Sequence, residues 1–94
     1  MNGKIIQSNT PEQNRFTSIS DFKWCMRCGG EVEFVWDGTT YSITHYNGNI
    51  AISHSRSQAT EMQRQTADEI LEYMVGGYRL RDIIKEVTVI YRTV

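Results

Sequence analysis

The sequence predicts a single α+β domain in which an antiparallel meander of three to four strands carries two helices from the C-terminal half on one face. Residues 31–55 alternate between apolar and more polar side chains, in three runs separated by Xaa-Gly pairs. From residue 66 the apolar residues recur at helical spacing instead. A chain of 94 residues has room for one thin core. We expect an N-terminal arm or short helix over residues 1–20 and the domain over residues 21–94.

The strands follow from alternation and from turn chemistry. Asp37-Gly38 and Asn47-Gly48 are typical of two-residue hairpin turns, because both residues of such a turn adopt positive φ. These turns would pair Trp36 with Thr39 and Tyr46 with Asn49. The β-branched tail over residues 88–94 predicts a last strand.

The helices follow from caps and apolar stripes. Thr10-Pro11 is typical of a helix start, and Thr66 with Glu69 forms a capping box ahead of a stripe that Gly76-Gly77 would end. A second stripe covers residues 80–87, whereas residues 56–65 show no clear period and predict a loop or a frayed helix start. The core is expected to contain six apolar side chains from sheet and helices: Phe34, Ile43, Ile70, Leu71, Ile83 and Ile84.

Composition argues against two classes of partner. Ten Lys and Arg oppose eleven Asp and Glu, and the resulting net charge of −1 is a poor match for nucleic acid, which requires clustered positive charge. No apolar run approaches the ~20 residues of a membrane span, and the N-terminus lacks the apolar core of a secretory signal. We therefore expect a reducing compartment and no structural disulfide.

Cys25 and Cys28 form a Cys-x-x-Cys pair followed by Gly29-Gly30, which resembles half of a zinc ribbon. Two intervening residues let one tight turn aim both sulfurs at one ion. The sequence thus predicts a zinc-knuckle-like turn and a structural Zn²⁺. Hairpin register places His45 beside this turn and makes it the third ligand.

The fourth ligand remains open between His54, Asp21, Asn47 and water. A regular meander places His54 opposite Tyr41, about four residues along the sheet from His45. Two other readings of the cysteines also remain open. They are buried apolar residues of a small core, or they are a redox dithiol, although a strand after Gly-Gly does not fit thioredoxin-type motifs.

Catalysis finds little support in the sequence. Ser53-His54-Ser55 lacks a nucleophile elbow, and Gly76-Gly77 lacks the Lys and Ser or Thr of a phosphate-binding loop. We therefore expect no enzyme. The chain has more aromatic side chains than a thin core can bury, so we expect some of them to face outward, where aromatic side chains anchor protein interfaces. The candidates are Trp24, Trp36, Tyr41, Tyr46, Tyr73, Tyr78 and Tyr91.

Residues 31–43 (EVEFVWDGTTYSI) and 67–84 (ADEILEYMVGGYRLRDII) resemble small accessory proteins of streptococcal phages and prophages. The resemblance implies a non-enzymatic inhibitor of host defence that acts in the host cytoplasm as a monomer or weak dimer. Anti-CRISPR proteins against the type II RNA-guided DNA nuclease belong to this class, and a zinc-containing example suits Cys25 and Cys28. The alternative is a small zinc-ribbon-like regulator that contacts nucleic acid.

Overall fold

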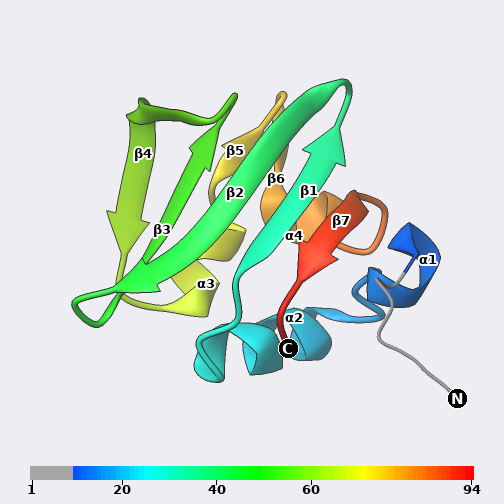
Figure 1. Cartoon of the computed structure of the whole chain (residues 1–94), viewed down its shortest axis with the longest axis horizontal. Helices are drawn as coiled ribbons and strands as arrows, with labels where there is room; N and C mark the ends of the chain where they lie inside the picture. Colours follow the sequence, from blue (N-terminus) through cyan, green and yellow to red (C-terminus); the bar gives the residue numbers. More distant parts are fainter. Residues whose placement is uncertain (1–9) are drawn as a thin grey trace, which may run out of the picture.

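The framework is a five-stranded antiparallel sheet with strand order β4-β3-β2-β1-β7 (Figure 1). The computed structural model describes residues 10–94. The strands are β1 (Val32–Trp36), β2 (Thr39–Tyr46), β3 (Asn49–His54), β4 (Ser57–Arg64) and β7 (Thr88–Arg92). The chain therefore builds an antiparallel α+β fold, and the strand expected over residues 88–94 is confirmed as β7.

Both predicted hairpin turns form, with the predicted register. Asp37 and Asn47 have φ values of 50° and 53°, and the glycine after each is also in the positive-φ region, as a type I′ turn requires. Trp36 pairs with Thr39, and Tyr46 pairs with Asn49.

The expectation of a loop or frayed helix over residues 56–65 is wrong, because most of this segment forms β4. Ser55 and Arg56 make a third turn at φ values of 56° and 53° without a glycine, so the usual turn signal is missing. As an edge strand, β4 leaves most side chains half-buried or exposed and needs no apolar alternation.

Two helices precede the sheet in the chain. The predicted start of α1 (Pro11–Asn14) is confirmed by a full capping box on Thr10. The second helix, α2 (Ile19–Arg27), was not predicted from the sequence. Its N-cap is Ser18, whose Oγ accepts a hydrogen bond from the backbone N–H of Asp21 at 3.0 Å.

The C-terminal half differs from the two predicted helices. The capping box at Thr66 is confirmed, but α3 (Ala67–Leu71) ends after five residues. Gly76-Gly77 does not end a helix. It forms the turn of a small hairpin made by β5 (Met74–Val75) and β6 (Tyr78–Arg79), with α4 (Leu80–Ile83) directly after it.

The predicted core is confirmed. The six core side chains named from the sequence are buried in one cluster, together with side chains from α2 such as Phe22 and Met26. In Figure 1, α3, α4 and the β5–β6 hairpin lie behind the sheet, and α2 lies across one end of it. Cross-strand rows of small and polar side chains, such as Glu33, Ser42 and Ser53, point to the opposite face.

The described N-terminal residues pack on the edge strand β7. Phe16 is fully buried, and the side-chain amide of Asn14 donates to the carbonyl of Val89 at 3.4 Å. This edge of the sheet is therefore partly covered, whereas β4 forms the other edge. No helix in residues 10–94 has the length and apolar character needed to cross a lipid bilayer.

Candidate functional site

The two cysteines lie in different environments at the end of α2. Cys25 is a buried residue of the helix, and Cys28 is its exposed C-cap. The backbone N–H of Cys28 donates to the Trp24 carbonyl at 3.0 Å, and that of Gly30 donates to the Cys25 carbonyl at 2.9 Å. The segment is thus the last turn of a helix and its exit, and the structure does not show the zinc-knuckle-like turn that the sequence predicts.

Burial sets the protonation of Cys25. Desolvation raises the pKa of its thiol, and the nearby Arg92 guanidinium opposes this rise only in part. A zinc ligand must be a thiolate, so metal binding at Cys25 would have to offset the cost of burying that charge.

Close packing explains why residue 30 is a glycine, and this explanation does not require a bound metal. A Cβ atom at this position would lie 2.5 Å from the Cys25 sulfur, so any larger residue would displace the thiol or the chain. Glycine is therefore required here by the close approach of the helix to the start of β1.

His45 occupies its predicted place beside this turn. Its Nε2 lies 2.9 Å from the carbonyl oxygen of Gly30, a contact that anchors the imidazole to the backbone. The other ligand candidates differ in position. Asp21 is paired with Arg92 at 2.6 Å, and His54 pairs with Tyr41 at the opposite end of the β2–β3 ladder. Asn47 occupies the β2–β3 turn.

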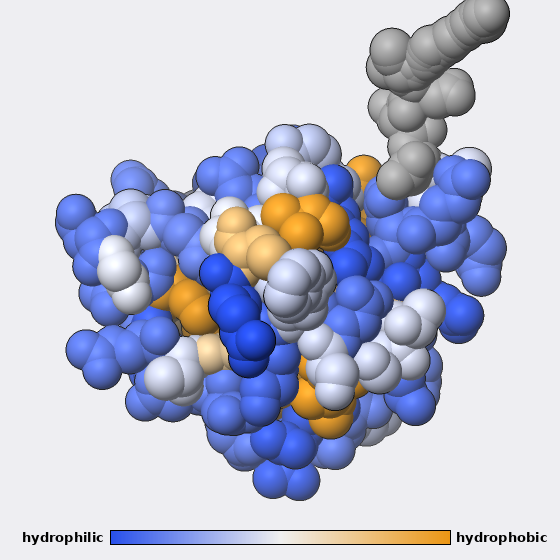
Figure 2. Space-filling model, turned by 90° about the horizontal axis from the view of Figure 1, so that it is seen from below, coloured by the Kyte–Doolittle hydropathy of each residue, from blue (hydrophilic) through white to orange (hydrophobic). Residues whose placement is uncertain are grey.

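Within residues 10–94, no three His, Cys, Asp or Glu side chains gather in a way that would hold a metal ion. The structure therefore brings His45 to the cysteine turn but does not assemble a complete ligand set. Zinc binding by Cys25, Cys28 and His45 stays a prediction. Seen from the α2 end, the surface is mostly hydrophilic, with apolar side chains in small separate patches (Figure 2).

A different surface surrounds the β5–β6 hairpin. We define the hairpin surface as five large side chains on and beside this hairpin: Trp36, Met62, Tyr73, Met74 and Tyr78. Met74 and Tyr78 are 56% and 55% exposed, and Met62 is 40% exposed, which are high values for apolar residues in a small domain. The hairpin thus presents apolar area to solvent on both of its sides.

On its β5 side the hairpin surface contains a groove of about 410 Å³. Its lining is formed by Met62 from β4, by Tyr73 and Met74, and by the buried side chains of Ile52 and Ile70. Three charged residues, Arg64, Glu69 and Glu72, also line it. The groove therefore combines apolar side chains with charged ones, and the unbranched methionine thioethers adapt to the shape of an apolar side chain.

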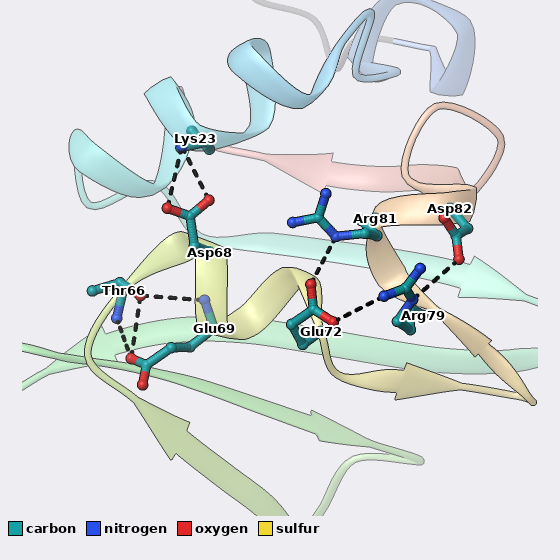
Figure 3. A network of polar contacts seen from close by, with 8 residues as sticks. All are labelled: Lys23, Thr66, Asp68, Glu69, Glu72, Arg79, Arg81 and Asp82. Atoms are coloured by element: carbon teal, nitrogen blue, oxygen red, sulfur yellow. Dashed lines mark hydrogen bonds and ion pairs between the residues drawn. The ribbon is translucent and has the colours of Figure 1, made fainter.

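Several ion pairs connect the hairpin and the neighbouring helices (Figure 3). The Glu72 carboxylate, directly after α3, accepts from Arg79 at 3.3 Å and from Arg81 at 2.8 Å. Arg79 also reaches Asp82 at 3.4 Å, and Lys23 of α2 pairs with Asp68 of α3 at 3.0 Å. The pairs of Glu72 and Arg79 join the end of α3 to β6 and α4, and the Lys23–Asp68 pair joins α2 to α3. All of these side chains are partly exposed, so each pair contributes little to stability.

Sequence reasoning found part of this surface. The expectation that some aromatic side chains face outward is confirmed for Trp24, Tyr46, Tyr78 and Tyr91, whereas Tyr41 is buried. Met62 and Met74 were missed. Met74 lies in the segment that the sequence predicts as a helix ending at Gly76-Gly77, whereas the chain leaves α3 after Leu71 and places Met74 on β5.

No protein-family model, no curated protein and no solved structure matches this chain.

Proposed function

We propose that this chain is a non-enzymatic phage-encoded inhibitor that binds a host protein through the hairpin surface. The observation that carries the proposal is the exposure of Met74 and Tyr78 on the β5–β6 hairpin. Exposed methionine and aromatic side chains are enriched at protein interfaces, because they bury a large apolar area when a partner covers them.

The area available is sufficient. A standard interface buries about 800 Å² on each partner. The chain exposes 5589 Å², so such an interface would occupy about one seventh of it.

The proposed target is the type II CRISPR RNA-guided DNA nuclease, and its support is the resemblance to phage accessory proteins. The charge distribution favours a protein surface over imitation of DNA. Glu33, Glu72 and Asp82 are neutralised within the molecule by Arg56, Arg79 and Arg81. We expect the inhibitor to block target DNA loading or cleavage by binding beside the DNA channel.

A titration of nuclease activity tests this proposal. Increasing amounts of the protein are incubated with the guide-loaded nuclease before target DNA is added, and cleavage is measured. Stoichiometric binding predicts an end point near one inhibitor per nuclease. Inhibition far below that ratio would indicate turnover and would contradict the proposal.

Variants locate the binding surface. Met74→Ser and Tyr78→Ser should each weaken inhibition by about tenfold or more, since interface anchors commonly contribute ~2 kcal/mol. Tyr91→Ser is the matched control, because Tyr91 is similarly exposed at 48% but lies on β7, away from the hairpin. Equal loss in all three variants, or in the control alone, would exclude the hairpin surface.

A further inference from the structure

The β6 side of the hairpin forms a corner between two aromatic rings. The Trp36 and Tyr78 ring centroids are 6.0 Å apart, and the rings are inclined at 83° to each other. Asp37 and Gly76 complete a cavity of about 390 Å³ around them. Tyr78 is 55% exposed, so the corner is open to solvent.

Asp37 is the acidic group of this corner. The other aspartates, Asp21, Asp68 and Asp82, each pair with a Lys or Arg side chain. Asp37 is exposed in the β1–β2 turn and belongs to none of the ion pairs formed within residues 10–94. The cavity therefore carries a negative charge without a cation from the described part of the chain.

Gly76 keeps the corner open. It adopts a φ of +56°, and a Cβ atom there would lie 3.4 Å from Cδ1 of Trp36. A side chain at this position would lie against the indole and narrow the cavity, so glycine serves both the turn and the space beside the ring.

Two aromatic rings and one carboxylate are a combination that recognises a cation. Ring faces attract positive charge through their quadrupole, and the carboxylate supplies a hydrogen-bond acceptor with full negative charge. A guanidinium suits this corner better than an ammonium, because it is planar, stacks on a ring and binds a carboxylate through two parallel hydrogen bonds.

We infer that the corner of Trp36, Asp37 and Tyr78 binds an arginine side chain of the protein partner. This inference rests on the proposed function, since it names the chemistry of the group that the partner inserts. It separates the hairpin surface into an apolar groove on the β5 side and a cation site on the β6 side.

The isolated protein tests the inference without any partner. A Trp24→Phe background leaves Trp36 as the single tryptophan of the chain, and its indole N–H signal reports on the corner in an NMR titration. The probes are butylguanidinium, butylammonium and the neutral butylurea at constant ionic strength. We expect saturable shifts with butylguanidinium, weaker binding of butylammonium and no saturation with butylurea.

Two variants identify the groups. Asp37→Asn removes the charge while asparagine tolerates the positive φ, and Tyr78→Leu removes one ring at an exposed position. Each should weaken butylguanidinium binding about threefold or more. Glu86→Gln, at an exposed site outside the ion pairs of the described residues, should leave it unchanged.

The outcomes are distinct. Unchanged binding in Asp37→Asn, or equal binding of butylurea, would overturn the cation site, and tighter binding of butylammonium would overturn the choice of arginine. Inhibition that requires Met74 but no binding of the probe would refute this inference alone. Binding of the probe without inhibition of the nuclease would refute the proposed function alone.

Discussion

Arg92 connects three parts of the molecule through one side chain. Its guanidinium donates to Asp21 at 2.6 Å and to the backbone carbonyl of Asn14 at 3.0 Å, and it stacks 4.3 Å from the centre of the Phe16 ring. The side chains of Arg92 and Asp21 are only 13% and 23% exposed, so water screens this pair less than the pairs around the hairpin.

Replacing Arg92 should therefore be costly. Arg92→Gln is expected to lower the free energy of unfolding by about 1–3 kcal/mol, because Asp21 would keep a partly buried charge without its partner. Urea denaturation at pH 7 measures the change. Lys23→Gln is the control, since the more exposed pair with Asp68 should contribute less than about 1 kcal/mol. Equal losses in the two variants would contradict this ranking.

The same pair predicts an acid-sensitive contribution to stability. The hydrogen bond from Arg92 lowers the pKa of Asp21, and desolvation opposes this only in part. A carboxyl group whose folded pKa is lowered stabilises the fold above its unfolded pKa of about 4, and this contribution is lost as the pH falls through the folded pKa. The stability difference between wild type and Arg92→Gln should consequently shrink below about pH 4.

Zinc binding is best tested at Cys28. Cys28 is exposed, so Cys28→Ser removes a ligand without disturbing the core, whereas Cys25→Ser alters a buried contact as well. A zinc ion on Cys25, Cys28 and His45 predicts one zinc per chain by elemental analysis and a loss of stability in Cys28→Ser. Protein without zinc and with titratable thiols, together with an unchanged Cys28→Ser variant, would leave the cysteines as residues of the helix end.

At the scale of elements, the sequence predicts those parts that depend on local chemistry. The Asp-Gly and Asn-Gly turns determine the register of β1, β2 and β3, since both residues of each pair suit positive φ. β4 could not be predicted in this way, because its turn uses Ser55 and Arg56 and its exposed residues carry no alternating pattern.

For the helices, a clear local pattern is present but predicts the wrong conformation. The apolar stripe from residue 67 to 75 fits a helix, yet the chain leaves α3 after Leu71 and forms the hairpin, in which the Leu80 N–H donates to the Tyr73 carbonyl at 2.9 Å. Burial of Val75 and Leu80 is equally possible from either conformation, so periodicity does not distinguish them. The position of the hairpin surface depends on this tertiary choice and was therefore not predictable from the sequence.

The β3–β4 turn offers a test at this scale. Replacing Ser55-Arg56 by Asn-Gly should raise the free energy of unfolding by up to about 1 kcal/mol, because both positions adopt positive φ that costs energy for most residues. The lost contact from Arg56 to Glu33 is an exposed pair at 3.7 Å and should matter little. Chemical denaturation measures the change. Gln58→Gly within β4 is the control and should destabilise the protein, and a less stable Asn-Gly variant would contradict the turn assignment.

At the scale of the whole molecule, the charge distribution favours the proposed inhibitor over the zinc-ribbon-like regulator of nucleic acid. The net charge is −1, and Lys23, Arg56, Arg79, Arg81 and Arg92 are each paired with a carboxylate. A protein with 6–10 phosphate contacts loses about 10³- to 10⁵-fold in affinity between 50 and 200 mM salt. Such a response requires basic side chains that bind DNA phosphates and so release the counterions of the DNA. In this chain, many of the basic side chains instead pair with carboxylates of the same molecule.

Binding to the nuclease should therefore depend weakly on salt. We expect the dissociation constant to change less than about fivefold between 50 and 200 mM salt, because salt does not screen the apolar contacts of the proposed anchors Met74 and Tyr78, and the proposed contact of Asp37 with an arginine adds a single ion pair. Calorimetric titration of the guide-loaded nuclease at both salt concentrations measures this ratio, and a parallel titration into a DNA duplex provides the comparison. Tight, steeply salt-dependent binding to the duplex would favour the regulator, since only a phosphate-binding surface responds to salt in this way.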